Sequence, residues 1–214
     1  MNSYTFALSD TDNAYMSLLA QSGVNLPDGR PLVVALNRLR LDRSGQPFEQ
    51  VRGPSFFVRC LDEGRAQGVR HFFLGGSPEL LETLKDCVDR RFPGVHIVGM
   101  ISPPFRQLTD AERTEQDVEI SASGAHVVWV GLGTPKQDFE AQRIYEECGV
   151  TTAAVGAAFD FVAGTKPEAP NWLRQLGLEW VFRLLSEPRR LWRRYLFGNT
   201  RFLMLVLREA RGRR

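Results

Sequence analysis

Short apolar runs alternate with amphipathic stretches along most of the chain. The apolar runs are dense in β-branched and aromatic residues and do not alternate strictly with polar ones, which is typical of strands covered on both faces. The stretches between them have the length and the period of helices. We therefore expect strands in the runs 31–37, 71–76, 96–101, 126–133 and 151–162, and helices over 54–68, 77–92, 109–124 and 134–149.

This repeated alternation predicts an α/β fold, a Rossmann-like parallel sheet with helices on both faces. The segment GTKPEAP at 164–170 interrupts the pattern with a glycine and two prolines, and everything after it has a helical pattern. We expect a Rossmann-like catalytic domain over 1–170 and a basic, amphipathic helical appendage over 171–214. Thr109 and Glu112 have the spacing of a capping box.

Charge is distributed unevenly along the chain. Its formal net charge is +2, yet the stretch from Arg183 to the end holds ten arginines against two glutamates, so the preceding part is acidic. Over 189–196 a helix would place arginines on one face and Leu, Trp and Tyr on the other. Gly198 is expected to end this helix, and Asn199 or Thr200 to cap the next.

The pattern of this basic tail leaves several functions open. It fits helices that pack an apolar face on the domain, a helix on an anionic membrane surface, or a charged lid over an anionic substrate. Nucleic-acid binding is less favoured, because the chain before Arg183 is acidic and contains no recognised nucleic-acid-binding motif. Near anionic lipid each arginine contributes on the order of 1 kcal/mol, so several arginines could hold the protein reversibly.

Other residue types argue against several classes of protein. The three cysteines are far apart and odd in number, which favours a reducing cytoplasm over a disulfide framework. There is no pattern of a signal peptide and no apolar run of the roughly 20 residues that span a bilayer, so we expect peripheral membrane contact at most. His71, His96 and His126 begin strands, at the edge opposite to the expected site, and no histidine cluster suggests a metal.

Two strand-to-helix turns have the chemistry of a phosphate site. Ligands of open parallel sheets bind beyond the carboxyl ends of strands, where glycines admit a ligand and helix starts offer free N–H groups. The alternative is a pair of well-capped turns, since short glycine motifs are weakly specific. The first turn holds Gly75 and Gly76, then Ser77 as the expected N-cap and Pro78 at the first helical position. The second repeats this arrangement with Gly131, Gly133, Thr134 and Pro135.

Four aspartates have both a structural and a functional interpretation. Asp28 stands in a Pro-Asp-Gly turn before an expected strand, and a turn is the favoured interpretation from the residues alone. Asp160 lies between two phenylalanines at an expected strand end, where a carboxylate is either paired or part of a site. Asp10 and Asp12 have the spacing of a cation-binding pair, but helix capping is the stronger interpretation.

Seven motifs in order resemble the WecG/TagA/CpsF glycosyltransferases from about residue 2 to residue 202. The most specific are SPPF, GLGTPKQ and the tail motif. The resemblance implies an inverting, metal-independent glycosyltransferase without a cofactor, acting in polysaccharide synthesis at the inner face of the cell membrane. The motifs are LPDGRPLV, RGPSFF, FFLGGSPELLETL, FPGVHIVGMISPPF, VWVGLGTPKQDF, VGAAFDFVAGT and APNWLRQLGLEWVFRLLSEPRRLWRRYL.

The implied donor is a UDP-sugar carrying N-acetylmannosamine or its uronic acid, and the implied acceptor is a sugar on a polyprenyl diphosphate. The resemblance makes Asp28 the general base. It places Arg52, Gln137 and Asp160 near the sugar or nucleotide. It assigns Arg183, Arg190 and Arg193 to a membrane-docking appendage that closes over the donor diphosphate.

Three departures from the family pattern accompany the resemblance. Asn2 stands for the asparagine of an acceptor-site Thr-x-Asn motif whose threonine is absent. The segment 35–46 is longer than the usual link, and Glu168 replaces an arginine. A non-catalytic nucleotide-binding or membrane-scaffolding homologue is the alternative, and a dehydrogenase is a weaker one, since no G-x-G-x-x-G precedes an acidic ribose partner. Oligomerisation is left open.

Overall fold

The computed structural model describes residues 1–21, 23–39 and 46–212. By internal contacts the chain divides into two compact units. We call 53–167 the sheet unit, and 1–52 with 168–214 the helical unit. The chain crosses from one unit to the other twice. The crossing between residues 167 and 168 lies inside the predicted boundary segment 164–170. The other precedes Gly53, so the first 52 residues group with the C-terminal helices. Residues 40–45 of the long link lie outside the described residues.

The sheet unit contains a four-stranded parallel sheet in the order β2-β1-β3-β4, which confirms the predicted α/β class. Four of the five expected runs form its strands. The strands are β1 (Arg70–Leu74), β2 (His96–Ile101), β3 (Val127–Val130) and β4 (Thr151–Ala154).

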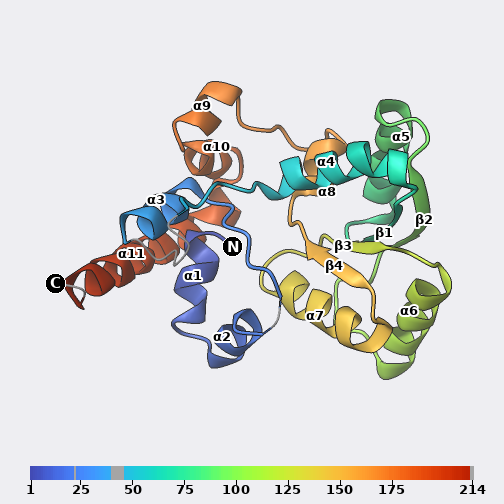
Figure 1. The fold of residues 1–214 in the computed structure, drawn as a ribbon, viewed down its shortest axis with the longest axis horizontal. Helices are drawn as coiled ribbons and strands as arrows, with labels where there is room; N and C mark the ends of the chain where they lie inside the picture. The colour runs from blue at the N-terminus through green and yellow to red at the C-terminus, as the bar shows by residue number, and fades with distance from the viewer. Residues whose placement is uncertain (22, 40–45, 213–214) are drawn as a thin grey trace. The chain divides into compact units, whose positions relative to one another are not determined.

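Helices cover both faces of this sheet, and each face has its own apolar core (Figure 1). Because side chains alternate across a strand, Phe73 and Trp129 point to one core, and Phe72 and Val128 point to the other. The first core lies under α4 (Gly53–Gly64), α5 (Pro78–Arg91) and α8 (Ala158–Val162), and the second under α6 (Asp110–Ala122) and α7 (Lys136–Cys148); the short 3-10 helix η1 spans Arg65–Gln67.

Two predicted helix starts in the sheet unit are confirmed. Ser77 caps α5 by accepting the Leu80 N–H at 3.2 Å. Thr109 and Glu112 form the reciprocal capping box at the start of α6. Each cap satisfies backbone N–H groups that a helix leaves unpaired at its start.

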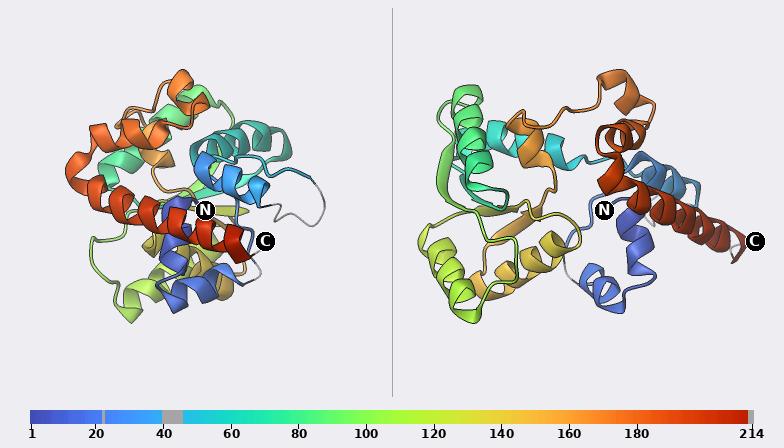
Figure 2. Two further views of the ribbon diagram at one scale, coloured as in Figure 1. Left: turned by 90° about the vertical axis from the view of Figure 1, so that its left-hand side faces the viewer. Right: turned by 180° about the vertical axis from the view of Figure 1, so that it is seen from behind.

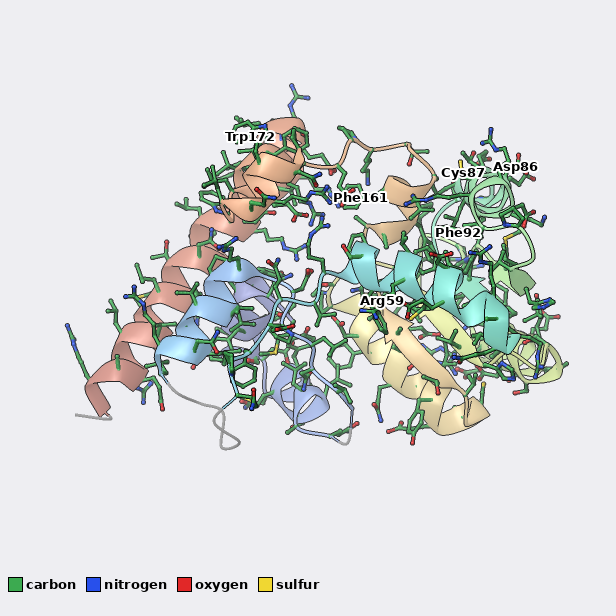
Figure 3. All side chains as sticks on the ribbon, turned by 45° about the horizontal axis from the view of Figure 1, so that its top comes forward. Arg59, Asp86, Cys87, Phe92, Phe161 and Trp172 are labelled. Atoms are coloured by element: carbon green, nitrogen blue, oxygen red, sulfur yellow. The ribbon has the colours of Figure 1, made fainter. Side chains whose placement is uncertain are left out.

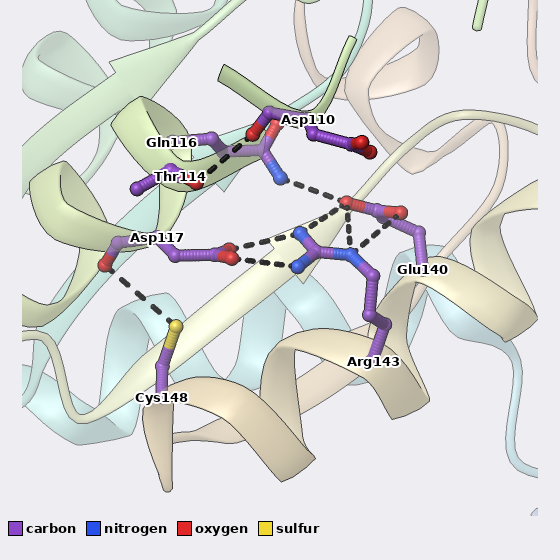
Figure 4. Close-up of polar contacts among 7 residues, drawn as sticks. All are labelled: Asp110, Thr114, Gln116, Asp117, Glu140, Arg143 and Cys148. Atoms are coloured by element: carbon purple, nitrogen blue, oxygen red, sulfur yellow. Dashed lines mark hydrogen bonds and ion pairs between the residues drawn. The ribbon is translucent and has the colours of Figure 1, made fainter. Parts of the chain in front are cut away.

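An ion-pair network joins α6 to α7 on the second face (Figure 4). The Arg143 guanidinium donates to both carboxylate oxygens of Asp117, at 2.7 and 2.9 Å, and to Glu140 at 2.8 Å. Glu140 also accepts from Gln116 at 2.7 Å, and the Cys148 thiol lies 3.7 Å from the Asp117 carbonyl oxygen. Hydrogen bonds to Asp117 raise the pKa of Arg143 above its usual value, against the effect of burial. The network fixes the two helices side by side.

The helical unit packs segments from the two ends of the sequence together. The long helix α11 packs against α1 and α10 (Figure 2). A small core joins Ala7, Leu32, Ala35 and Phe202. The helices of the unit are α1 (Ser3–Ser9), α2 (Asn13–Leu19), α3 (Arg30–Arg38), α9 (Asn171–Gln175), α10 (Glu179–Ser186) and α11 (Pro188–Gly212).

The strand expected over 31–37 is wrong, because this run forms α3. Leu32 and Ala35 are buried, whereas Val34 is 45% exposed. Burial with a spacing of three follows the helical period and not the alternation of a strand. The apolar run was too short to separate the two by composition.

The strand expected over 151–162 is wrong in its second half. β4 ends at Ala154, and the chain turns at Gly156, whose φ is +59°, before α8. A glycine adopts this left-handed conformation without a steric cost. Asp160 therefore lies on a helix and not at a strand end.

The helix end expected at Gly198 is also wrong, because α11 continues through this position. Gly198 is buried, and a Cβ there would lie 3.0 Å from Cδ2 of Tyr4. The glycine permits close packing of α1 on α11. The two-faced wheel over 189–196 is only partly realised: Leu191 is buried, whereas Trp192 and Leu196 are 45% and 57% exposed.

Candidate functional site

The order of the strands creates a switch point in the sheet unit. From β1 the chain adds β2 on one side, and β3 and β4 on the other. Open α/β sheets bind ligands outside the carboxyl ends of the strands that flank such a reversal, which here are β1 and β3. Gly75 and Gly131 are the residues that follow these two strands.

The two predicted turns meet at this switch point. Gly75 has a φ of +122°, and a Cβ on it would lie 2.7 Å from the carbonyl oxygen of Gly131. Gly131 in turn faces the Phe159 ring, with 2.8 Å between its ideal Cβ and Cδ2. The expectation that both turns share one sheet edge is confirmed. Glycine is required at Gly75 by the Gly131 backbone and at Gly131 by the Phe159 ring.

The first turn has the predicted geometry. Gly76 has a φ of +81°, and its carbonyl oxygen accepts from the Ser102 hydroxyl at 2.7 Å. Ser77 then starts α5, a helix of 14 residues, so its N–H groups and positive dipole end point toward the same edge. This turn therefore offers backbone donors to an anion.

The second turn differs from its prediction. Pro135, and not Thr134, directly precedes α7, and no side chain caps this helix. The Gln137 amide oxygen instead accepts the Gly133 N–H at 3.1 Å, and its nitrogen lies 3.4 Å from the Thr134 hydroxyl. Gln137 is buried, so it shapes the turn from within.

Asp160 follows β4 and lies in the first turn of α8. Its carboxylate pairs with Lys166 at 3.1 Å and lies 3.4 Å from the Thr165 hydroxyl. The sequence left open whether this carboxylate is paired or part of a site, and the structure shows an ion pair with Lys166.

In the helical unit, the structure brings Asp28 and Asn2 together. The Asp28 N–H donates to the Met1 carbonyl at 2.7 Å, and the ideal Cβ of Gly29 lies 3.3 Å from the Asn2 Cβ. Asp28 is half-buried just before α3. Asn2 caps α1, since its Oδ1 accepts from the N–H groups of Tyr4 and Thr5.

Arg52 is held by two glutamates of the same unit. Its Nε and one terminal nitrogen bind both carboxylate oxygens of Glu179, at 3.0 and 3.1 Å, and Glu168 accepts from that terminal nitrogen at 2.7 Å. The Arg52 side chain is only 13% exposed. Burial alone would lower the pKa of Arg52, but the hydrogen bonds to Glu179 and Glu168 raise it, so the side chain is a fixed cation.

Arginines of α10 and α11 gather around Tyr195. Burial raises the pKa of the Tyr195 phenol, against the charges of Arg183, Arg194 and Arg190. Burial lowers the pKa of Arg194, and the charges of Arg183 and Arg190 lower it further. Several like charges that act on one another are suited to an anionic ligand.

The position of Arg193 differs from that of its neighbour. Arg193 is exposed, and its guanidinium lies 5.2 Å from the Trp192 ring centre. Arg194 is half-buried, with its guanidinium 4.3 Å from the Tyr4 ring centre. Arg190 is exposed and pairs with Glu187 at 2.6 Å.

Three residues of this cluster were missed from the sequence: Glu179, Arg194 and Tyr195. Glu179 and Arg183 have the i, i+4 spacing of a helical ion pair, which was a usable signal. No local signal linked Glu179 to Arg52, because 127 positions separate them.

The histidines lie at the amino ends of the strands, as predicted. His71 is buried in β1, and its Nδ1 accepts from the Trp129 indole N–H at 3.0 Å. Burial, with the charges of His126 and His96, lowers the pKa of His71 to about 4. Within the described residues, no group of three or more His, Cys, Asp or Glu side chains could hold a metal ion.

Comparison with known proteins decides the family. The model of the "Glycosyl transferase WecG/TagA/CpsF family" matches residues 1–214. The chain belongs to this family. It is therefore a glycosyltransferase, as the resemblance implied.

Two curated relatives carry the same name, "N-acetylglucosaminyldiphosphoundecaprenol N-acetyl-beta-D-mannosaminyltransferase". The protein of Bacillus spizizenii strain W23 is 30% identical over 201 residues, which are 92% of this chain and 73% of the relative. The protein of Bacillus subtilis strain 168 is 26% identical over 211 residues, 97% of this chain and 77% of the relative. In the part of the chain that the structure describes, no helix has the length and apolar character of a membrane span.

Proposed function

We propose that this glycosyltransferase moves N-acetylmannosamine, or a closely similar sugar, from a UDP donor to an N-acetylglucosamine carried on a polyprenyl diphosphate. The observation that carries the nucleotide part is the approach of Gly75 and Gly131 at the switch point of the sheet. The names of the two relatives support the sugar and the acceptor. No cofactor takes part in this reaction.

In the sheet unit, the two glycine turns bind the nucleotide. Backbone N–H groups at Gly76 and Ser77 and the start of α5 suit phosphate oxygens. Gln137 acts by holding the turn at Gly133 and Thr134 in shape. Asp160 belongs to the same group through its place after β4.

In the helical unit, Asp28 acts as the general base, Arg52 lies beside the donor sugar, and Asn2 lies on the acceptor side. The acceptor hydroxyl oxygen attacks the anomeric carbon, its proton moves to the Asp28 carboxylate, and the bond from that carbon to the diphosphate oxygen breaks. UDP leaves with the electron pair. A single displacement of this kind inverts the anomeric centre and needs one carboxylate to take the proton.

The departing UDP gains negative charge, which Arg183, Arg190 and Arg193 compensate. Arginine forks match phosphate oxygens in geometry and stay charged, so they can perform this task without a metal ion. Arg194 joins them because it is half-buried and the charges of Arg183 and Arg190 act on it.

The exposed surface of α9 to α11 suits the membrane that carries the acceptor. Trp172 projects from α9 and is 60% exposed (Figure 3). Leu185, Phe197 and Leu203 are 76%, 65% and 57% exposed, on helices rich in arginine. Aromatic and aliphatic side chains beside cations are typical of helices that lie in a membrane interface. We place the protein on the inner face of the cell membrane; a homo-oligomer stays a prediction.

The substitution Asp28→Asn tests the reaction. It keeps the size of the side chain and removes its basicity, so transfer from UDP-N-acetylmannosamine should fall by about 1,000-fold, within the usual range for general acid–base catalysis. Thermal unfolding should be unchanged. Asp89→Asn, which removes a carboxylate from an exposed pair with Lys85, is the matched control and should keep full activity. Full activity of a folded Asp28→Asn protein would reject the role of base.

A further inference from the structure

The two glutamates that hold Arg52 are themselves part of a longer row of charges. Glu168 accepts from Arg52 at 2.7 Å and from Arg174 at 3.1 Å. The row Glu179–Arg52–Glu168–Arg174 therefore contains two cations and two anions and is neutral as a whole. Arg52 and Glu168 are also the residues at which the chain leaves and re-enters the helical unit.

The charge of Arg52 is already compensated by two glutamates. The paired bonds to Glu179 are the parallel, fork-to-fork arrangement that binds a guanidinium most strongly. Glu168 adds a second carboxylate to the same terminal nitrogen. A further carboxylate that approached Arg52 would be repelled by Glu168 and Glu179, which already bind the guanidinium. Solvent would screen this repulsion weakly, because only 13% of the Arg52 side chain is exposed.

A neutral sugar meets no such opposition. Carboxylate oxygens each have lone pairs for more than one hydrogen bond, so Glu168 and Glu179 can accept from sugar hydroxyl or amide N–H groups while they bind Arg52. A sugar that carries a carboxylate can only accept at that group. The row of charges therefore favours N-acetylmannosamine over its uronic acid, the two donor sugars that the sequence left open.

We propose that Glu168, supported by Glu179, selects a donor with an uncharged N-acetylhexosamine and rejects the corresponding uronic acid. Glu168 acts through Arg52, so it is a specificity-determining residue and not a catalytic one. The inference rests on the proposed function in one respect, the location of the donor sugar near Arg52.

The substitution Glu168→Gln isolates the charge. Glu168 makes one of the hydrogen bonds to Arg52, and glutamine keeps its length and an acceptor oxygen. Glu168→Arg reverses the charge. Glu63→Gln is the matched control, since Glu63 forms an exposed pair with Arg59 on α4.

The experiment compares transfer by the full chain from UDP-N-acetylmannosamine and from UDP-N-acetylmannosaminuronate to the same lipid-linked acceptor. The wild type should prefer the neutral donor by at least about 100-fold in kcat/KM, and Glu168→Gln should reduce that preference about tenfold, as expected for the loss of one close like charge. Glu168→Arg should reduce it further, and Glu63→Gln should leave it unchanged. A merely structural role would lower both rates together and leave their ratio constant.

Two results would overturn the inference: equal use of both donors by the wild type, or an unchanged ratio in both folded Glu168 variants. Failure of the wild type to transfer either sugar would instead reject the proposed function. The affinities of the two UDP-sugars, measured by calorimetry on the same proteins, then decide the inference, because equal affinities for the wild type would refute it.

Discussion

The two glycine turns of the sheet unit and two arginines of the helical unit differ in how far along the chain their partners lie. In the sheet unit, Ser77 binds the Leu80 N–H, and Gln137 binds the Gly133 N–H, within four positions. In the helical unit, Arg52 binds Glu168 and Glu179 across 116 and 127 positions, and Arg201 binds Asp10 across 191. The first unit offers backbone donors fixed by local sequence, and the second offers side-chain charges assembled by folding.

This difference suggests two ways to handle one phosphorylated donor. Backbone turns cannot change their charge or retract, so they suit the constant nucleotide. Side-chain pairs can be re-matched by single substitutions, so they suit the part of the reaction in which charge develops and sugars differ. Both kinds of group can be tested separately.

Removal of Arg183 should give the largest effect among these tests. Arg183→Ala should lower kcat by about 100-fold or more, the usual loss when a preorganised charge donor is removed from a developing anion. Arg193→Ala should lower kcat by about tenfold or less, since the Arg193 side chain is exposed to solvent and lies over the Trp192 ring. Steady-state kinetics with Arg59→Ala as control would measure both. Equal losses of kcat for the two variants would contradict the expectation that the half-buried Arg183 contributes more than the exposed Arg193.

Two glycines of the sheet unit should differ in what an added methyl group does to stability. In Gly131→Ala, the new Cβ would lie 2.8 Å from the Phe159 ring, so the free energy of unfolding should fall by about 3 kcal/mol through overpacking. In Gly133→Ala, the methyl group meets no atom within 4 Å, and only the φ of +78° opposes it, at about 1 kcal/mol. Urea denaturation of both variants would measure the difference. Equal losses would mean that the contact with the Phe159 ring does not require glycine at position 131.

Acidification should weaken the sheet unit through His71. The pKa of His71 is lowered to about 4 in the fold from an ordinary 6.5, first by burial and then by the charges of His126 and His96. Between these values the unfolded chain binds the extra proton, so stability is complete above pH 6.5 and is lost as the pH falls toward 4. The contribution lost between pH 7 and pH 5 is about 2 kcal/mol.

Urea denaturation of the wild type and His71→Phe at both pH values isolates this group. The variant loses the acceptor for Trp129 and is less stable at pH 7, but its stability should depend less on pH. His96→Gln, at an exposed position, should keep most of the wild-type dependence. The same pH dependence in His71→Phe and the wild type would contradict the assignment.

The sequence predicted the sheet unit better than the helical unit. Four strands, the caps at Ser77 and Thr109, and the meeting of Gly75 with Gly131 followed from apolar runs, turn residues and the rule for parallel sheets. The helical unit produced more errors. Residues 31–37 form α3 because Leu32 and Ala35 bury a helical face against Phe202, and Gly198 stays inside α11 because it faces Tyr4. Both outcomes depend on neighbours that are distant in sequence.

The sequence by itself determined the family, the α/β class, the glycine turns and the excess of arginine in the tail, because each depends on order or on spacing within a few residues. The tertiary structure decided which neighbours the cations have: Arg194 lies over the Tyr4 ring, and Arg52 lies between Glu168 and Glu179. The physical reason is that the pairing and the pKa of a charged group depend on the atoms within a few ångströms of it. In the helical unit those neighbours come from opposite ends of the chain.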